Sequence, residues 1–139
     1  MLIVMALAAS ACQQNTGAAG SPGTAPEGFN AIGADEAITA LGNEPFWNAT
    51  ITGSSLVYKT PENIEGSSLS VDRFTGQGGL GFSGQFEGAA FDLLITAGEC
   101  SDTMSDRTYP YTATLRIGEE QRNGCAYTDK QMFSGDESP

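Results

Sequence analysis

Alternation of apolar and polar residues is the clearest pattern in this chain. Residues 80–86 (LGFSGQF) and 111–117 (YTATLRI) place an apolar residue or a glycine at every second position. A period of two residues is typical of a strand that buries one face. Less regular candidates are residues 46–52, 56–60, 69–74, 91–96 and 125–128. We therefore expect about seven short strands.

Residues typical of tight turns separate these segments, namely Gly53-Ser54, Pro61-Glu62-Asn63, residues 76–79, Gly88 and Gly118-Glu119-Glu120. No segment has a convincing amphipathic helical pattern. We predict an all-β domain, a small antiparallel meander that closes into a lipocalin-like barrel, because closure hides the edges of the sheet. A two-sheet β-sandwich is the alternative.

The front of the chain has the features of an export signal. Residues 1–11 (MLIVMALAASA) are apolar and then small, and they lead directly into Cys12. This stretch resembles a bacterial lipoprotein signal peptide, with Ala9-Ser10-Ala11-Cys12 in the place of the lipobox. The resemblance implies that Cys12 becomes the lipidated N-terminus, and plain cleavage is the alternative. Gln13, in the position after the cysteine, resembles a signal for the outer membrane, facing the periplasm.

The composition changes after Cys12. Residues 12–35 are rich in Gly, Ala, Ser, Pro, Thr and Asn and lack hydrophobic periodicity, as is typical of a flexible linker. We therefore expect three parts, which are a signal peptide at 1–11, the lipidated Cys12 with its linker at 12–35, and a β-barrel domain at 36–139.

The charge and the residue types narrow the functions. Six Lys and Arg against 17 Asp and Glu give a net charge of -11, which disfavours nucleic acid and would attract a basic protein partner. The chain has no histidine, which excludes imidazole as a base or a zinc ligand. It also has no apolar run of about 18 residues, so we expect membrane attachment through the N-terminal lipid alone.

Lipidation of Cys12 would leave Cys100 and Cys125 as a pair in an oxidising compartment. We predict a disulfide between these two cysteines, which would close a loop of roughly 25 residues. A catalytic thiolate at Cys100 is the alternative. It is disfavoured because a reactive thiolate needs a nearby cation or a helix N-terminus, and the neighbours here are Glu99 and Asp102.

Two other motifs have plainer interpretations. Residues 76–81 (GQGGLG) match G-x-G-x-x-G by letter, but they open the cleanest strand rather than a helix, so we interpret them as a hairpin loop. Asp102 and Asp106 could share a calcium ion, although the alternating oxygen ligands of a calcium loop are missing. The alternative is that these aspartates cap turns and pair with Arg107.

The only tryptophan, Trp47, follows Pro45 at the start of the first candidate strand. We expect it either to close one end of the barrel, with Arg107 or Arg116 over its ring as in lipocalin-like barrels, or to be an ordinary core residue. Both roles are structural.

Five segments together resemble a family of bacterial envelope lipoproteins with a GxEPFW start and a CSDxMSDRxYP...GCA ending. They are residues 42–47, 100–102, 104–107, 109–111 and 124–126. Members of this family are often joined to, or described beside, the inhibitor domain of membrane-bound lysozyme inhibitors and the META domain. The resemblance implies a location in the cell envelope but no particular activity. The chain lacks the early cysteine of the inhibitor pattern.

Our main hypothesis is a non-enzymatic, lipid-anchored protein of the bacterial cell envelope whose barrel binds a protein or a small ligand. No catalytic residue, metal ligand or cofactor is predicted, and the candidate binding surface comprises Trp47, Asp102, Asp106, Arg107 and Tyr109. A lysozyme-type inhibitor is the alternative, because lysozymes are strongly basic. A glycan hydrolase that uses Asp102, Asp106 or Glu99 as acid and base is a third, less favoured hypothesis. A purely structural role in the envelope has no positive signature.

Overall fold

A computed structural model describes residues 28–135 of the chain. The predicted signal peptide, Cys12 and the front of the linker lie outside these residues. The described part forms nine strands: β1 (Ile38–Asn43), β2 (Phe46–Thr52), β3 (Ser55–Thr60), β4 (Asn63–Ser70), β5 (Asp72–Thr75), β6 (Gly79–Phe86), β7 (Ala89–Ser101), β8 (Thr108–Ile117) and β9 (Glu120–Thr128). No helix within residues 28–135 is long and apolar enough to cross a membrane.

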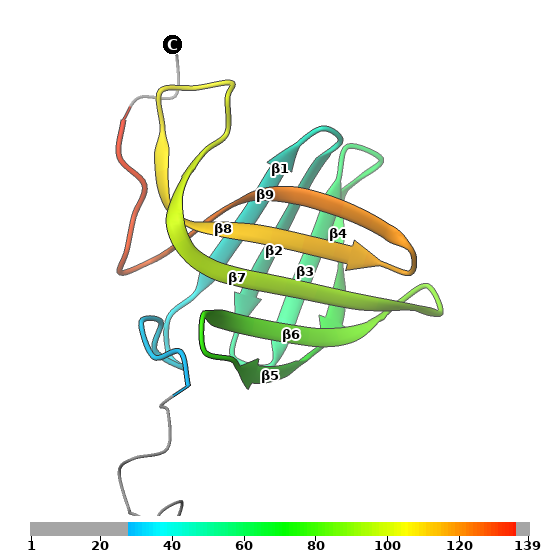
Figure 1. The fold of residues 1–139 in the computed structure, drawn as a ribbon. Coiled ribbons are helices and arrows are strands. Elements are labelled where there is room, and N and C mark those ends of the chain that lie inside the picture. Colours follow the sequence, from blue (N-terminus) through cyan, green and yellow to red (C-terminus); the bar gives the residue numbers. More distant parts are fainter. Residues whose placement is uncertain (1–27, 136–139) are drawn as a thin grey trace, which may run out of the picture.

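All nine strands belong to one antiparallel sheet in the order β4-β3-β2-β1-β9-β8-β7-β6-β5. Most pairs are sequence neighbours, as in a meander, and the pairing of β1 with β9 curls the sheet round into a barrel shape (Figure 1). No ladder joins β4 to β5, so one seam stays open. The prediction of an all-β, barrel-forming meander is confirmed, and a single continuous sheet is not the two-sheet sandwich.

The core fills the interior of the barrel. Along β8 the buried residues alternate with half-buried ones, which is the period-two pattern that the sequence shows over this strand. The large side chains inside include Ile38, Trp47, Leu56, Tyr58, Phe82, Phe91, Leu93, Ile95 and Leu115. Because these side chains occupy the interior, the barrel has a packed core rather than a channel.

The turn signals mark the hairpins correctly. Glu87 and Gly88, between β6 and β7, both have positive φ, at 51° and 80°, as a type I′ turn requires. Two strand predictions need correction. The segment of β1 was not among the candidates, because Ile38 and the small Ala40 give only a weak alternation on its buried face. The candidate strand at 69–74 is divided between β4 and β5 at Val71, whose N–H bonds to the carbonyl of Ser54.

The folded domain begins before Glu36. The side chain of Ile32 is 1% exposed and belongs to the core, and the ring of Phe29 packs edge-on against Tyr111. Arg73 Nη2 donates to the carbonyl of Ile32 at 2.8 Å. Residues 28–35 therefore belong to the domain rather than to the predicted linker, because Ile32 is part of its core and Phe29 packs against that core.

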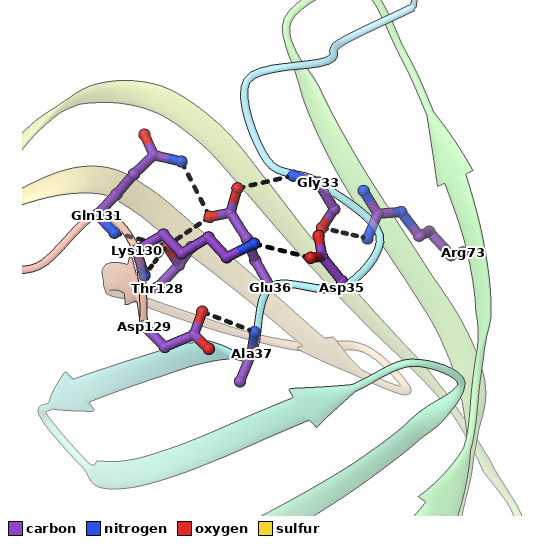
Figure 2. A network of polar contacts seen from close by, with 9 residues as sticks. All are labelled: Gly33, Asp35, Glu36, Ala37, Arg73, Thr128, Asp129, Lys130 and Gln131. Carbon is purple, nitrogen blue, oxygen red and sulfur yellow. Dashed lines mark hydrogen bonds and ion pairs between the residues drawn. The ribbon is translucent and has the colours of Figure 1, made fainter.

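A polar cluster joins residues 33–37, before and at the start of β1, to residues 128–131 at the end of β9 (Figure 2). The carboxylate of Glu36 accepts hydrogen bonds from Gly33 N (2.9 Å), Thr128 Oγ1 (2.6 Å) and Gln131 Nε2 (3.1 Å). The hydrogen bonds from Gly33 and then Thr128 hold the pKa of Glu36 below its usual value. Lys130 Nζ lies 2.7 Å from an oxygen of Asp35. These contacts join the two ends of the domain on the side where β1 enters the barrel.

Candidate binding surface

The longest connection of the domain is held against the sheet by a disulfide. Cys100, near the end of β7, is bonded to Cys125 on β9, with 5.5 Å between their Cα atoms. The predicted disulfide is confirmed. The register of β7 against β8 shifts between Ala97 and Cys100, and Gly98 in this bulge has a φ of 141°. The bulge and the disulfide together turn the end of β7 across β8 toward β9.

Asp102 organises the loop between β7 and β8. Its Oδ1 accepts from the N–H groups of Met104 (3.0 Å) and Ser105 (2.9 Å), and its Oδ2 accepts from Ser105 Oγ (2.8 Å) and Tyr109 OH (3.2 Å). Burial raises the pKa of Asp102, but the hydrogen bonds from Ser105, Met104 and Tyr109 outweigh it and hold this pKa below its usual value. The carboxylate thereby fixes the backbone of the loop.

Aromatic rings pack together beside the loop between β7 and β8. Tyr109 is 1% exposed, and its ring centroid lies 6.0 Å from that of Tyr127 and 5.5 Å from that of Phe133. Burial raises the pKa of the Tyr109 hydroxyl. The guanidinium carbon of Arg107 lies 4.1 Å from the centroid of the Phe133 ring, at a distance typical of a cation–π contact. The segment after β9 is therefore part of the loop's support.

Trp47 is a core residue of β2, not of the first strand, and it is 3% exposed. Its indole lies so close to Gly42 and Gly124 that a Cβ at either position would collide with the ring or with neighbouring backbone. The expectation that Arg107 or Arg116 covers the ring is wrong. Arg107 lies over Phe133, and Arg116 is exposed on β8, opposite Asp92.

Two segments far apart in the sequence meet at this loop. Asn43 Nδ2, beside the β1–β2 turn, donates to the carbonyl of Asp102. A hollow of about 400 Å³ lies between them, and an adjoining hollow of about 390 Å³ runs along the disulfide. Phe46 and Met104 line the first hollow and are 52% and 55% exposed. We use the name loop face for the surface formed by Asn43, Phe46, Asp102, Met104 and Arg107.

The loop face includes only part of the surface predicted from the sequence. Asp102, Arg107 and Tyr109 line the same hollow, whereas Trp47 is buried in the barrel and the exposed Asp106 is outside the lining. The sequence argument did not include Asn43, Phe46 and Met104. Phe46 could have been found from the strand alternation, because Trp47 points inward and its neighbour must therefore point outward.

The loop face shows no arrangement of side chains for a metal site. Asp102 already accepts hydrogen bonds from the loop's own donors, which leaves it poorly placed to hold a calcium ion with Asp106. Within residues 28–135, no group of three His, Cys, Asp or Glu side chains is arranged to bind a metal. The chain matches no protein-family model, no curated protein and no solved structure.

Proposed function

We propose that this chain is a lipid-anchored protein of the bacterial cell envelope, anchored through Cys12, and that its barrel is a non-enzymatic binding domain. The loop face is the binding surface, and a protein is its partner. The observation that carries the proposal is the meeting of exposed Phe46 and Met104 beside a loop held by the Cys100–Cys125 disulfide. The resemblance of residues 1–12 to a lipoprotein signal supports the location.

The loop face has the composition expected of a contact surface. Its large apolar side chains, Phe46 and Met104, would be desolvated on binding, and Arg107 and Asp102 add charged groups to the same lining. The hydrogen bonds to Asp102 and the aromatic support of Tyr109 fix the loop before any partner arrives. Such a surface loses little conformational entropy on binding.

A hydrolytic role receives less support. A general acid in a glycan hydrolase needs a raised pKa, whereas the pKa of Asp102 is lowered by the hydrogen bonds of its loop. Glu99 and Asp106 are exposed, on the bulged end of β7 and on the loop. Neither lines the hollow beside Asp102.

Site-specific photo-crosslinking in a bacterial host tests the loop face. A photoreactive amino acid would replace Phe46 or Met104 in the full chain, and Leu94, which is 43% exposed on β7, gives the matched control. We expect the same discrete protein adduct from positions 46 and 104 and none from position 94. Equal adducts from all three positions, or none from any, would reject the loop face as the binding surface.

A lysozyme-type enzyme is one specific candidate for the partner. The net charge of -11 would speed encounter with a strongly basic enzyme, and this attraction weakens as salt rises. Purified domain would be titrated into a lysozyme cell-lysis assay at low and at high salt. Protection that is stronger at low salt supports inhibition, and unchanged lysis at both salt concentrations rejects it.

A further inference from the structure

A second hollow of the described domain lies at the end of the barrel where four hairpin turns gather, and of the loop-face residues it shares only Phe46. It has a volume of about 760 Å³, within the range of small-molecule sites. Residues at or next to all four turns line it: β1–β2, β3–β4, β6–β7 and β8–β9. These turns lie at the top and right of the barrel in Figure 1. We call this hollow the barrel mouth.

The barrel mouth is lined by residues of β4 and β6, the strands on either side of the open seam. β5 pairs with β6 only as far as Ser83, so residues 84–86 of β6 extend beyond that ladder. Near Ser70, β4 comes so close to β6 that a Cβ on Gly84 would lie 2.7 Å from the Ser70 carbonyl oxygen. At the other end of β4, Asn63 lines the mouth together with Phe86 of β6. The mouth therefore borders the open seam.

The floor of the mouth is aromatic and carries one polar contact across the barrel. The rings of Tyr58 and Phe86 meet edge to face, with centroids 5.2 Å apart. Arg122 Nη1 donates to the hydroxyl of Tyr58 at 2.6 Å, and Arg122 Nη2 lies 3.2 Å from Glu120. Ile117 completes the apolar part of the floor. The positive charge of Arg122 is thus already matched by a carboxylate.

The charged residues around the opening of the mouth, which we call its rim, carry more negative than positive charge. Glu62, Glu87 and Glu120 line the mouth against the single cation Arg122. Within residues 28–135, neither Glu62 nor Glu87 is in an ion pair. Burial raises the pKa of the Tyr58 hydroxyl, Arg122 lowers it, and the negative charges of Glu120 and Glu62 raise it further. Two of the three rim carboxylates, Glu62 and Glu120, thus act on the hydroxyl that Arg122 contacts.

We propose that the barrel mouth is a second binding site, which takes a small organic cation made of an ammonium or guanidinium group on an apolar body. The apolar body packs on Phe86, a half-buried ring whose π-face attracts cations and which lies against the buried Tyr58, and the charged group lies between Glu62 and Glu87. An organic anion would meet the negative excess and be repelled. This site does not depend on the function proposed for the loop face.

Titration of the ¹⁵N-labelled full chain, carrying Cys12→Ser to prevent lipidation, tests the site. The probes are benzylammonium, the neutral benzyl alcohol and the anion benzoate. We expect saturable amide shifts at Thr60, Phe86 and Ile117 with benzylammonium, much weaker shifts with benzyl alcohol and none with benzoate. Equal binding of benzyl alcohol, or shifts confined to other parts of the barrel, would overturn the proposal.

Matched variants separate the rim from the overall charge. Glu62→Gln and Glu87→Gln should each weaken benzylammonium binding about threefold, the effect of one partly exposed charge pair. Glu65→Gln and Glu119→Gln remove the same charge beside the mouth, at residues that do not line it, and should leave the affinity unchanged. If all four variants weaken binding equally, only the net charge matters and the site is refuted.

Discussion

At the scale of single residues, the loop face depends on groups whose partners are fixed by geometry. Asp102 accepts hydrogen bonds from two backbone N–H groups and from the hydroxyls of Ser105 and Tyr109. Gly42 and Gly124 leave room for the ring of Trp47 inside the barrel. Asp102 is required as a hydrogen-bond acceptor for its neighbours. Gly42 and Gly124 are required because a larger residue would occupy the space of the Trp47 ring or of neighbouring backbone.

Asp102→Ala should lower the free energy of unfolding at pH 7 by about 1–2 kcal/mol, because the N–H groups of Met104 and Ser105 lose their acceptor. Urea denaturation measures the loss, and hydrogen exchange should accelerate at these two amides. Asp106→Ala, an exposed aspartate on the same loop, is the control and should cost less than about 0.5 kcal/mol. Equal costs for the two variants would contradict the role of Asp102.

The difference in unfolding free energy between wild type and Asp102→Ala should depend on pH. The pKa of Asp102 is lowered in the folded state from its ordinary value of 3.8, so the unfolded chain binds the proton more readily. The stabilisation by this carboxylate is therefore fully present above pH 3.8 and is lost as the pH falls through the lower folded pKa. The difference between wild type and Asp102→Ala should shrink in that acidic range.

At the scale of elements, β7 and β8 also hold the loop that connects them in place. β7 continues to Ser101, past its bulge, and the disulfide to β9 holds its end over the neighbouring strands. The segment after β9 adds Phe133 beneath the loop and pairs Ser134 with Thr108. The loop between β7 and β8 is thus held by these two strands and by the segment after β9, and the disulfide joins β7 to β9.

Cys100→Ser with Cys125→Ser should lower the free energy of unfolding by about 3.5 kcal/mol, the loop-entropy value for a crosslink that spans 25 residues. Urea denaturation of the oxidised full chain and the double variant gives the difference. Added reductant should destabilise the wild type and leave the variant unchanged. A difference below about 1 kcal/mol would mean that the loop is held without the disulfide.

Much of this architecture could be predicted from the sequence, for reasons visible in particular segments. The alternation over 80–86 and 111–117 and the glycines at the turns predict the hairpins, because side chains on a strand must alternate between core and solvent. The pairing of β1 with β9, the burial of Ile32 and the meeting of Asn43 with Asp102 could not be predicted. They depend on contacts between residues far apart in the chain, which local patterns do not encode.

At the scale of the whole molecule, the domain is a nearly closed barrel with two candidate binding surfaces, which share Phe46. The polar cluster around Glu36 joins its two ends, the loop face lies over the disulfide, and the mouth opens at the seam. Under the proposed function, the net charge of -11 would disfavour nucleic acid as a partner and would favour solubility beside a membrane. An anchor at Cys12 would hold both surfaces close to that membrane.

Labelling with radioactive palmitate in a bacterial host tests the proposed anchorage most directly, in the full chain and in its Cys12→Ala variant. The account predicts a labelled mature product, which begins at Cys12, in the membrane fraction and an unlabelled variant. An unlabelled product that stays in the cytosol would contradict the account, since an unexported chain would lack both its anchor and the oxidising compartment that the Cys100–Cys125 disulfide requires.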